Sequence, residues 1–69
     1  MDFILRGEYI ELDKLLKATG LAESGGRARI MITEGLVQVD GQAESRKTAK
    51  IRAGQVVTVG AERVVVSAA

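Results

Sequence analysis

Positive charge is concentrated in one short segment, residues 45–52, with the sequence SRKTAKIR. Its basic residues are Arg46, Lys47, Lys50 and Arg52, and no acidic residue stands between them. Such a cluster favours contacts with nucleic-acid phosphates, which give salt-dependent affinity and little sequence specificity. The alternative interpretation is a solvated loop that only keeps the domain soluble.

A second candidate is the stretch Ser24-Gly25-Gly26-Arg27. Ser24 is a good N-cap for a helix over residues 25–34, and the free amides of a helix start attract anions. Glycines there would let a phosphate approach the backbone closely. The stretch therefore predicts a phosphate contact at Ser24, Gly25 and Gly26, with an ordinary capped helix start as the alternative.

Four more basic side chains are candidates for phosphate contact. Arg27 and Arg29 belong to the helix that Ser24 would begin, but at about 100° per residue they lie roughly 160° apart around its axis. Lys14 and Lys17 lie on an earlier predicted helix and are second-rank candidates, with a solvated face as the alternative. Lys17 also stands one turn after Asp13 and could pair with it.

Composition excludes most other chemistry. The chain has no cysteine and no histidine, so it lacks disulfides, thiolates and the commonest metal ligand and general base. We expect no catalytic residue, no metal site and no cofactor. Phe3 and Tyr9 are the only aromatic residues, which argues against a platform for stacking single-stranded bases.

Length and charge distribution predict one small domain spanning residues 1–69. Residues 1–24 hold five acidic and three basic side chains, whereas residues 25–58 hold six basic and three acidic ones. No apolar run approaches the roughly 20 residues that span a bilayer, and the N-terminus does not resemble a signal peptide. We therefore expect a cytoplasmic protein with no membrane partner.

Hydrophobic periodicity predicts two helices that would position these side chains. The first spans residues 12–19, with leucines in one stripe, and Gly20 stops it. The second spans residues 25–34, buries Ala28, Met31 and Ile32, and ends at Gly35. The short link between them predicts a helix-turn-helix pair. Ile30 points away from the apolar stripe, and we expect it to pack under the C-terminal hairpin, with an exposed contact to a protein partner as the alternative.

The remaining segments predict strands. Residues 1–10 indicate an edge strand bent at Gly7. Residues 36–40 alternate apolar and polar, Asp40-Gly41 is a strong tight-turn signal, and residues 42–44 should return as a strand. Residues 55–59 and 63–67 indicate a hairpin, and Ala68 and Ala69 should fray. The fold class is thus α+β, with a helix-turn-helix pair packed on a small, mainly antiparallel sheet.

The order of these motifs resembles the S4 RNA-binding domain. The matching pieces are Leu12-Asp13-Lys14-Leu15-Leu16, then Ser24, Ala28 and Gly35, then Val37-Gln38-Val39-Asp40-Gly41, then Gly54-Gln55-Val56-Val57-Thr58-Val59. The match covers residues 11–59, and the chain is most similar to the short free-standing bacterial members. The family often has arginine where Glu11 and Gly25 stand, so positive charge is missing at two positions.

The resemblance implies an S4-like fold with an αL-type motif and a non-catalytic RNA-binding function. The implied partner is structured or ribosomal RNA, contacted through backbone phosphates. We expect a monomer, with ribosomal or RNA-processing proteins as further partners. One alternative is a protein-interaction module in which RNA binding has been lost. Another is DNA binding, although the glycine-led second helix brings few base-reading side chains to a groove.

Overall fold

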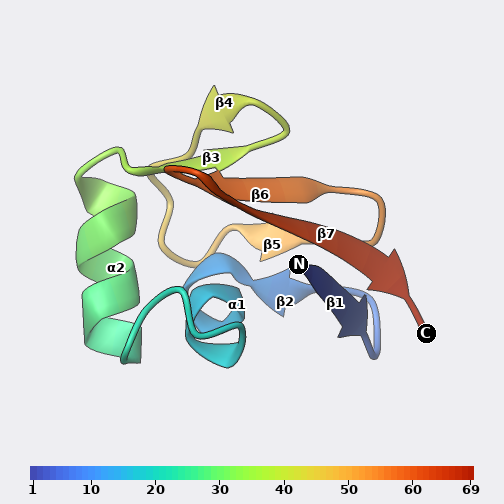
Figure 1. Cartoon of the computed structure of the whole chain (residues 1–69). Helices are drawn as coiled ribbons and strands as arrows, with labels where there is room; N and C mark the ends of the chain where they lie inside the picture. Colours follow the sequence, from blue (N-terminus) through green and yellow to red (C-terminus); the bar gives the residue numbers. More distant parts are fainter.

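Two helices pack on one face of a five-stranded sheet, and a separate two-stranded ribbon lies beside the first helix (Figure 1). The computed structural model describes all residues, 1–69. In chain order the elements are β1 (Asp2–Leu5), β2 (Ile10–Glu11), α1 (Leu12–Ala18), α2 (Gly25–Thr33), β3 (Val37–Val39), β4 (Gln42–Ala43), β5 (Lys50–Ile51), β6 (Val56–Val59) and β7 (Glu62–Ala68). The expected α+β class and helix-turn-helix pair are confirmed.

The larger sheet has the strand order β1-β7-β6-β3-β4. All of its pairings are antiparallel except β1 with β7, which run parallel. The predicted edge position of the N-terminal strand is confirmed. The prediction of one bent strand over residues 1–10 is wrong, because the chain turns at Gly7 with φ +106° and enters the other sheet, where β2 pairs with β5.

Helix α1 has its first backbone amides satisfied by the basic segment. Leu12 N–H donates to the Ala49 carbonyl at 2.9 Å, and Asp13 N–H donates to the Lys47 carbonyl at 3.1 Å. A helix start normally needs partners for these groups, and here no side chain supplies them. The backbone of residues 47–49 is therefore fixed against the start of α1, which sets where the neighbouring cations project.

Helix α2 is bounded as its sequence predicts. The Ser24 side chain accepts a hydrogen bond from Arg27 N–H at 3.1 Å, so the predicted N-cap is present. At the other end, Gly35 has φ +78°, and Leu36 N–H donates to the Met31 carbonyl while Gly35 N–H donates to the Ile32 carbonyl. This pair of bonds is the Schellman arrangement, which glycine accommodates without steric cost.

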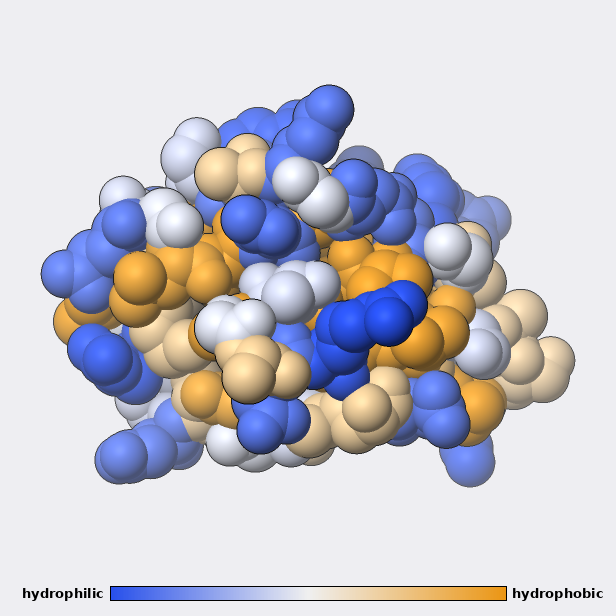
Figure 2. All heavy atoms as spheres, turned by 45° about the horizontal axis from the view of Figure 1, so that its top comes forward, coloured by the Kyte–Doolittle hydropathy of each residue, from blue (hydrophilic) through white to orange (hydrophobic).

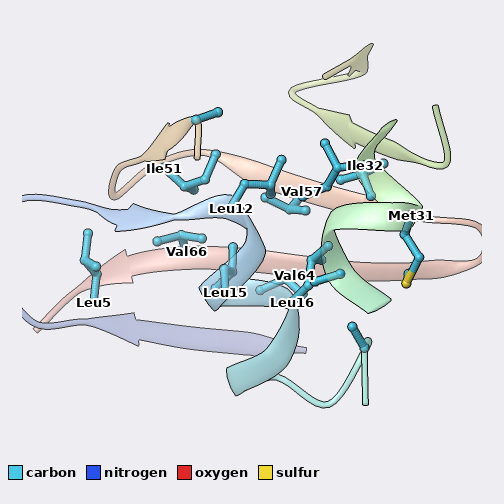
Figure 3. Packing of buried hydrophobic residues seen from close by; sticks show 14 residues of the cluster. Leu5, Leu12, Leu15, Leu16, Met31, Ile32, Ile51, Val57, Val64 and Val66 are labelled. Carbon is cyan, nitrogen blue, oxygen red and sulfur yellow. The ribbon is translucent and has the colours of Figure 1, made fainter. Parts of the chain in front are cut away.

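The core lies between the helices, the ribbon and the inner face of the larger sheet. Figure 3 shows leucines of α1 near Ile32 of α2, valines of β6 and β7, and Ile51 of β5, and Met31 of α2 belongs to the same cluster. The buried apolar residues are Leu5, Leu12, Leu15, Leu16, Ala22, Ala28, Met31, Ile32, Val37, Ala49, Ile51, Val57, Val64 and Val66. Because Ala49 and Ile51 are among them, the basic segment is part of the core on its inner side.

Some apolar side chains remain outside this core. Ile30 is 49% exposed, so the expectation that it packs under the C-terminal hairpin is wrong, since its side of α2 faces solvent. Met1, Ile4, Tyr9 and Leu36 are also exposed. Figure 2 shows one face of the molecule on which apolar regions lie between hydrophilic side chains. The surface is therefore mixed in character rather than uniformly charged.

Backbone pairing fixes two local features. Asp40 and Gly41 have φ of 51° and 84°, as a tight hairpin turn requires, and the Asp40 carboxylate accepts a hydrogen bond from Val56 N–H at 2.9 Å. At the C-terminus, Ala68 pairs with Leu5 in the parallel ladder, and Ala69 N–H donates to the Leu5 carbonyl at 3.2 Å. The expectation that these alanines fray is therefore wrong.

Neither helix has the length or apolar character to cross a membrane.

Candidate functional site

The ribbon of β2 and β5 carries a row of polar side chains on its outer face. Ile10 pairs with Ile51 and Glu11 with Lys50 in its antiparallel register. Ile51 is only 1% exposed, so its side of the ribbon faces the core. Side chains alternate along strands, which places Glu11 and Lys50 on the outer face, with Tyr9 and Arg52 flanking the ribbon on the same side.

Tyr9 lies among the cations of this outer face. The Lys50 Nζ atom is 5.0 Å from the centre of the Tyr9 ring, and the Arg52 Cζ atom is 5.7 Å from it. Both distances are within the range of cation–π attraction. Arg52 is held further by a 3.4 Å hydrogen bond from Nη1 to the Glu8 carbonyl. Sequence reasoning missed Tyr9, because strands of two residues give no periodic signal that would pair positions about 40 residues apart.

Two surface hollows open beside the ribbon. One, of about 450 Å³, is lined by Arg46, Thr48, Ala49 and Lys50. The other, of about 320 Å³, is lined by Tyr9, Ile10, Glu11 and Lys14. Glu11 and Lys50 are directly paired across the ribbon, so the hollows are neighbours. The first offers two cations and a hydroxyl, which suits an anion, and the second combines an aromatic ring with one acid and one base.

Arg46 is held by a neighbouring carboxylate. Its Nε and Nη2 atoms donate to the two Glu44 oxygens at 3.1 and 3.0 Å, and its backbone N–H donates to Glu44 at 3.0 Å. These hydrogen bonds from Arg46 lower the pKa of the Glu44 carboxyl from its ordinary 4.5 to about 2. The Glu44 carboxylate thus offsets part of the Arg46 charge, and the segment with the predicted four-cation patch carries less net charge than the four cations alone indicate. The sequence feature that could have indicated this ion pair is Glu44, an acid two residues before Arg46.

The Glu44 bridge should make stability depend on pH. Because the folded-state pKa of Glu44 is lowered, its stabilising contribution is present above the unfolded-state pKa and is lost as the pH falls through about 2. We expect Glu44→Gln to flatten the change in unfolding free energy between about pH 5 and pH 2. Urea unfolding at a series of pH values measures this. Glu62→Gln, at an exposed acid outside any ion pair, is the control, and equal flattening in both variants would contradict the assignment.

Arg29 of α2 reaches across to α1. Its Nη1 atom lies 3.5 Å from Oδ2 of Asp13, whose side chain is only 9% exposed. The guanidinium also lies over the start of α2, because a Cβ atom at Gly25 would stand 3.3 Å from Arg29 Nη1. Glycine at this position therefore leaves room for the Arg29–Asp13 bridge. Asp13, for which the sequence suggested a pairing with Lys17, links both helices to the carbonyl of Lys47.

The start of α2 retains backbone donors that face outward. Ser24 caps the N–H of Arg27, and the Ala28 N–H donates to the Ser24 carbonyl at 3.0 Å. Gly25 and Gly26 form the first helical positions, where no preceding turn can accept their N–H groups. Arg27 is exposed on the flank of α2 opposite Arg29, so the structure does not bring these two arginines together.

The two lysines of α1 differ in their surroundings. Lys14 Nζ lies 2.9 Å from Oε1 of Glu11, and this hydrogen bond raises the pKa of Lys14. Lys17 is exposed near the C-terminal end of α1, where a cation suits the helix dipole. The predicted pairing of Lys17 with Asp13 is wrong, because Asp13 pairs with Arg29 instead. Lys14 thus belongs to the ribbon side of α1, and Lys17 does not.

Five candidate cations surround the start of α1 and are called the basic face. Each of these cations belongs to a segment that is connected to the start of α1 by backbone hydrogen bonds or by an ion pair. They are Lys14, Arg29, Lys47, Lys50 and Arg52. Arg46 lies at the edge of the basic face and shares a hollow with Lys50. The acids Glu11, Asp13 and Glu44 form ion pairs with three of these six side chains.

Comparison with known proteins gives consistent matches. A family model described as the S4 domain matches residues 3–67. The chain is 50% identical over 60 residues to "Putative RNA-binding protein YbcJ" of Escherichia coli (strain K12), covering 87% of this chain and 86% of that protein. The "Uncharacterized protein YbcJ" of Shigella flexneri matches with the same identity and coverage.

A solved structure also resembles this chain. The solution structure of YbcJ from E. coli has a TM-score of 0.74 and 46% identity, covering 96% of this chain and 85% of that one. Its description says that it reveals a recently discovered αL motif involved in RNA-binding. The resemblance to the S4 RNA-binding domain stated from the sequence is therefore confirmed.

Proposed function

The chain belongs to the S4 domain family, and from that premise we propose that it is a non-catalytic RNA-binding protein that holds the phosphate backbone of a structured RNA. Folded ribosomal RNA is the ligand class we propose. RNA binding of this kind is carried by positive charge arranged on a rigid scaffold, because phosphate contacts supply affinity and fix orientation.

The observation that carries the proposal is the gathering of cations around the start of α1. The backbone of residues 47–49 is hydrogen-bonded to that start, so the cations beside it project from a fixed frame. Lys47, Lys50 and Arg52 are exposed and have no acidic partner within 4.0 Å. They are the residues we assign to direct phosphate contact, and Arg46 joins them when RNA competes with Glu44.

A second phosphate is proposed at the start of α2. The outward amides of Gly25 and Gly26 and the positive end of the helix dipole suit an anion. Arg29, whose guanidinium lies beside Gly25, adds charge at the same place. Arg29, one helical turn later, thus offsets the absence of an arginine at position 25. Arg27 and Lys17 lie away from this surface and have a smaller role.

The proposal includes a setting for the activity. The protein acts as a monomer in the cytoplasm, where structured RNA is available, and ribosomal or RNA-processing proteins are its further partners. Recognition through shape and backbone phosphates, rather than base edges, is the usual means by which folded RNA is bound. Sequence preference among folded RNAs of similar shape should therefore be small.

Binding to a fluorescent RNA hairpin over a salt series tests the proposal. We expect the logarithm of affinity to fall linearly with the logarithm of salt concentration, by roughly 0.7–0.9 for each phosphate engaged. Four to six contacts would give a slope of about −3 to −5. Anisotropy of the labelled RNA measures affinity at each concentration.

Duplex DNA of the same sequence is the matched competitor. Displacement of the hairpin only at a large excess of DNA supports recognition of the RNA helix shape. Equal competition by DNA would contradict the RNA assignment in favour of general polyanion binding. Absence of binding even at low salt would overturn the proposed function.

A further inference from the structure

The aromatic side chain of Tyr9 does not pack in the core. Phe3 packs against the core cluster, whereas Tyr9 is 42% exposed on the outer face of the ribbon. In the neighbouring pair, Ile51 is buried in the core and Ile10 is half-buried. The chain contains no other aromatic residue, and because Phe3 is partly buried, Tyr9 is the more exposed of the two rings.

Two cations hold the Tyr9 ring in place. Lys50 and Arg52 stand two residues apart on β5 and its flank, so both project to the side where the ring lies. The hydrogen bond from Arg52 to the Glu8 carbonyl limits movement of the guanidinium. A ring that is already oriented loses little further freedom when a ligand stacks on it, which lowers the cost of binding.

The hollow beside Tyr9 has a lining that suits a nucleobase. It has a volume of about 320 Å³, at the lower end of the usual range for small-ligand sites. Ile10 also lines the hollow. The Glu11 carboxylate and the Lys14 ammonium lie 2.9 Å apart, and each keeps further capacity to accept or donate hydrogen bonds. A base has an apolar face and an edge of donors and acceptors, so it can satisfy all of these groups together.

We propose that Tyr9 is a stacking platform for one unpaired nucleobase of the bound RNA, with Lys50 and Arg52 beside the adjoining phosphates. The inference rests on the proposed function and narrows it to RNAs with a bulged or looped-out nucleotide next to a helix. A fully paired helix keeps its bases stacked on one another and offers none to the ring. The low aromatic content argued against any stacking contact, but one ring suffices for one base.

Two RNA hairpins with the same stem test this inference, one fully paired and one with a single bulged nucleotide. Stacking on an aromatic ring corresponds to about 5- to 150-fold in affinity, so the wild-type protein should prefer the bulged hairpin within that range. The readout is the ratio of the two affinities. Tyr9→Leu, which keeps apolar bulk, should bring the ratio close to one, whereas Tyr9→Phe should retain it.

A direct signal comes from replacing tyrosine by 3-fluorotyrosine, because a chain with one tyrosine gives one fluorine resonance. The bulged hairpin should shift that resonance through the ring current of the stacked base, and the paired hairpin should shift it much less. An affinity ratio near one in the wild-type protein, or an unchanged affinity ratio in Tyr9→Leu, would overturn the inference. Salt-dependent binding to both hairpins would still leave the proposed function intact. Failure to bind either hairpin would overturn both.

Discussion

Replacing Lys47 and Lys50 together with glutamate is expected to weaken binding to a structured RNA by on the order of 10- to 100-fold at fixed salt. Each substitution removes an attraction to phosphate and adds a repulsion. The salt dependence should also become shallower, by about 1.5 in the log–log slope, because two phosphate contacts are lost. Anisotropy titrations of a labelled hairpin measure both quantities, and circular dichroism checks that the fold persists.

A matched control changes the same amount of charge elsewhere. Arg6→Glu plus Arg63→Glu alters two exposed basic residues outside the basic face and should cost far less affinity. Since a glutamate at position 50 would face Glu11 across the ribbon, Lys47→Gln plus Lys50→Gln provides a variant without that repulsion. We expect the glutamine variant to show about half of the change in log affinity of the glutamate variant. Equal losses of RNA affinity in the charge-reversed pair and its control would contradict the assignment of phosphate contacts to the basic face.

Shortening Leu16 to alanine is expected to lower the unfolding free energy by about 2–5 kcal/mol. Leu16 is fully buried in the core between the helices and the sheet, so the truncation loses apolar burial and leaves a cavity (Figure 3). The total stability of a domain this size is roughly 3–10 kcal/mol. The loss is about half of that stability at the midpoints of the two ranges, so Leu16→Ala should unfold at a clearly lower urea concentration and temperature than the wild-type protein, as circular dichroism can measure.

Ile30→Ala is the matched control on the other helix. Its side chain is 49% exposed on the outer side of α2, and surface substitutions of this kind usually change stability by about 0.5 kcal/mol or less. If Ile30→Ala were as destabilising as Leu16→Ala, Ile30 would have to be packed in solution as the sequence suggested. A small loss for Leu16→Ala would contradict the position of the core.

Several features could be predicted because their causes are local. The leucines of α1 and the stripe of Ala28, Met31 and Ile32 follow helical periodicity. Ser24 and Gly35 bound α2, whereas the start of α1 is satisfied by the distant residues 47–49. The Asp40-Gly41 turn follows from two residues that tolerate positive φ. The basic segment at residues 45–52 is visible in composition alone. These signals together were enough for the fold class and for the resemblance to the S4 domain.

Other features depend on contacts between distant segments. The break at Gly7 could not be predicted, because β2 is a strand only through its pairing with β5, and two residues carry no periodic pattern. Likewise, Ala68 and Ala69 are ordered by β1, at the other end of the chain. Register across long separations is decided by how well the whole core packs, which no short window of sequence records.

The sequence by itself determined the helices, the hairpins, the residue types available for chemistry and the segment where positive charge gathers. Only the tertiary structure decided which partner each cation has: Arg29 pairs with Asp13 across the two helices, whereas Lys50 and Arg52 lie near the Tyr9 ring and have no acidic partner. The physical reason is that charge and propensity belong to single residues, whereas an ion pair or an exposed ring depends on where the rest of the chain lies.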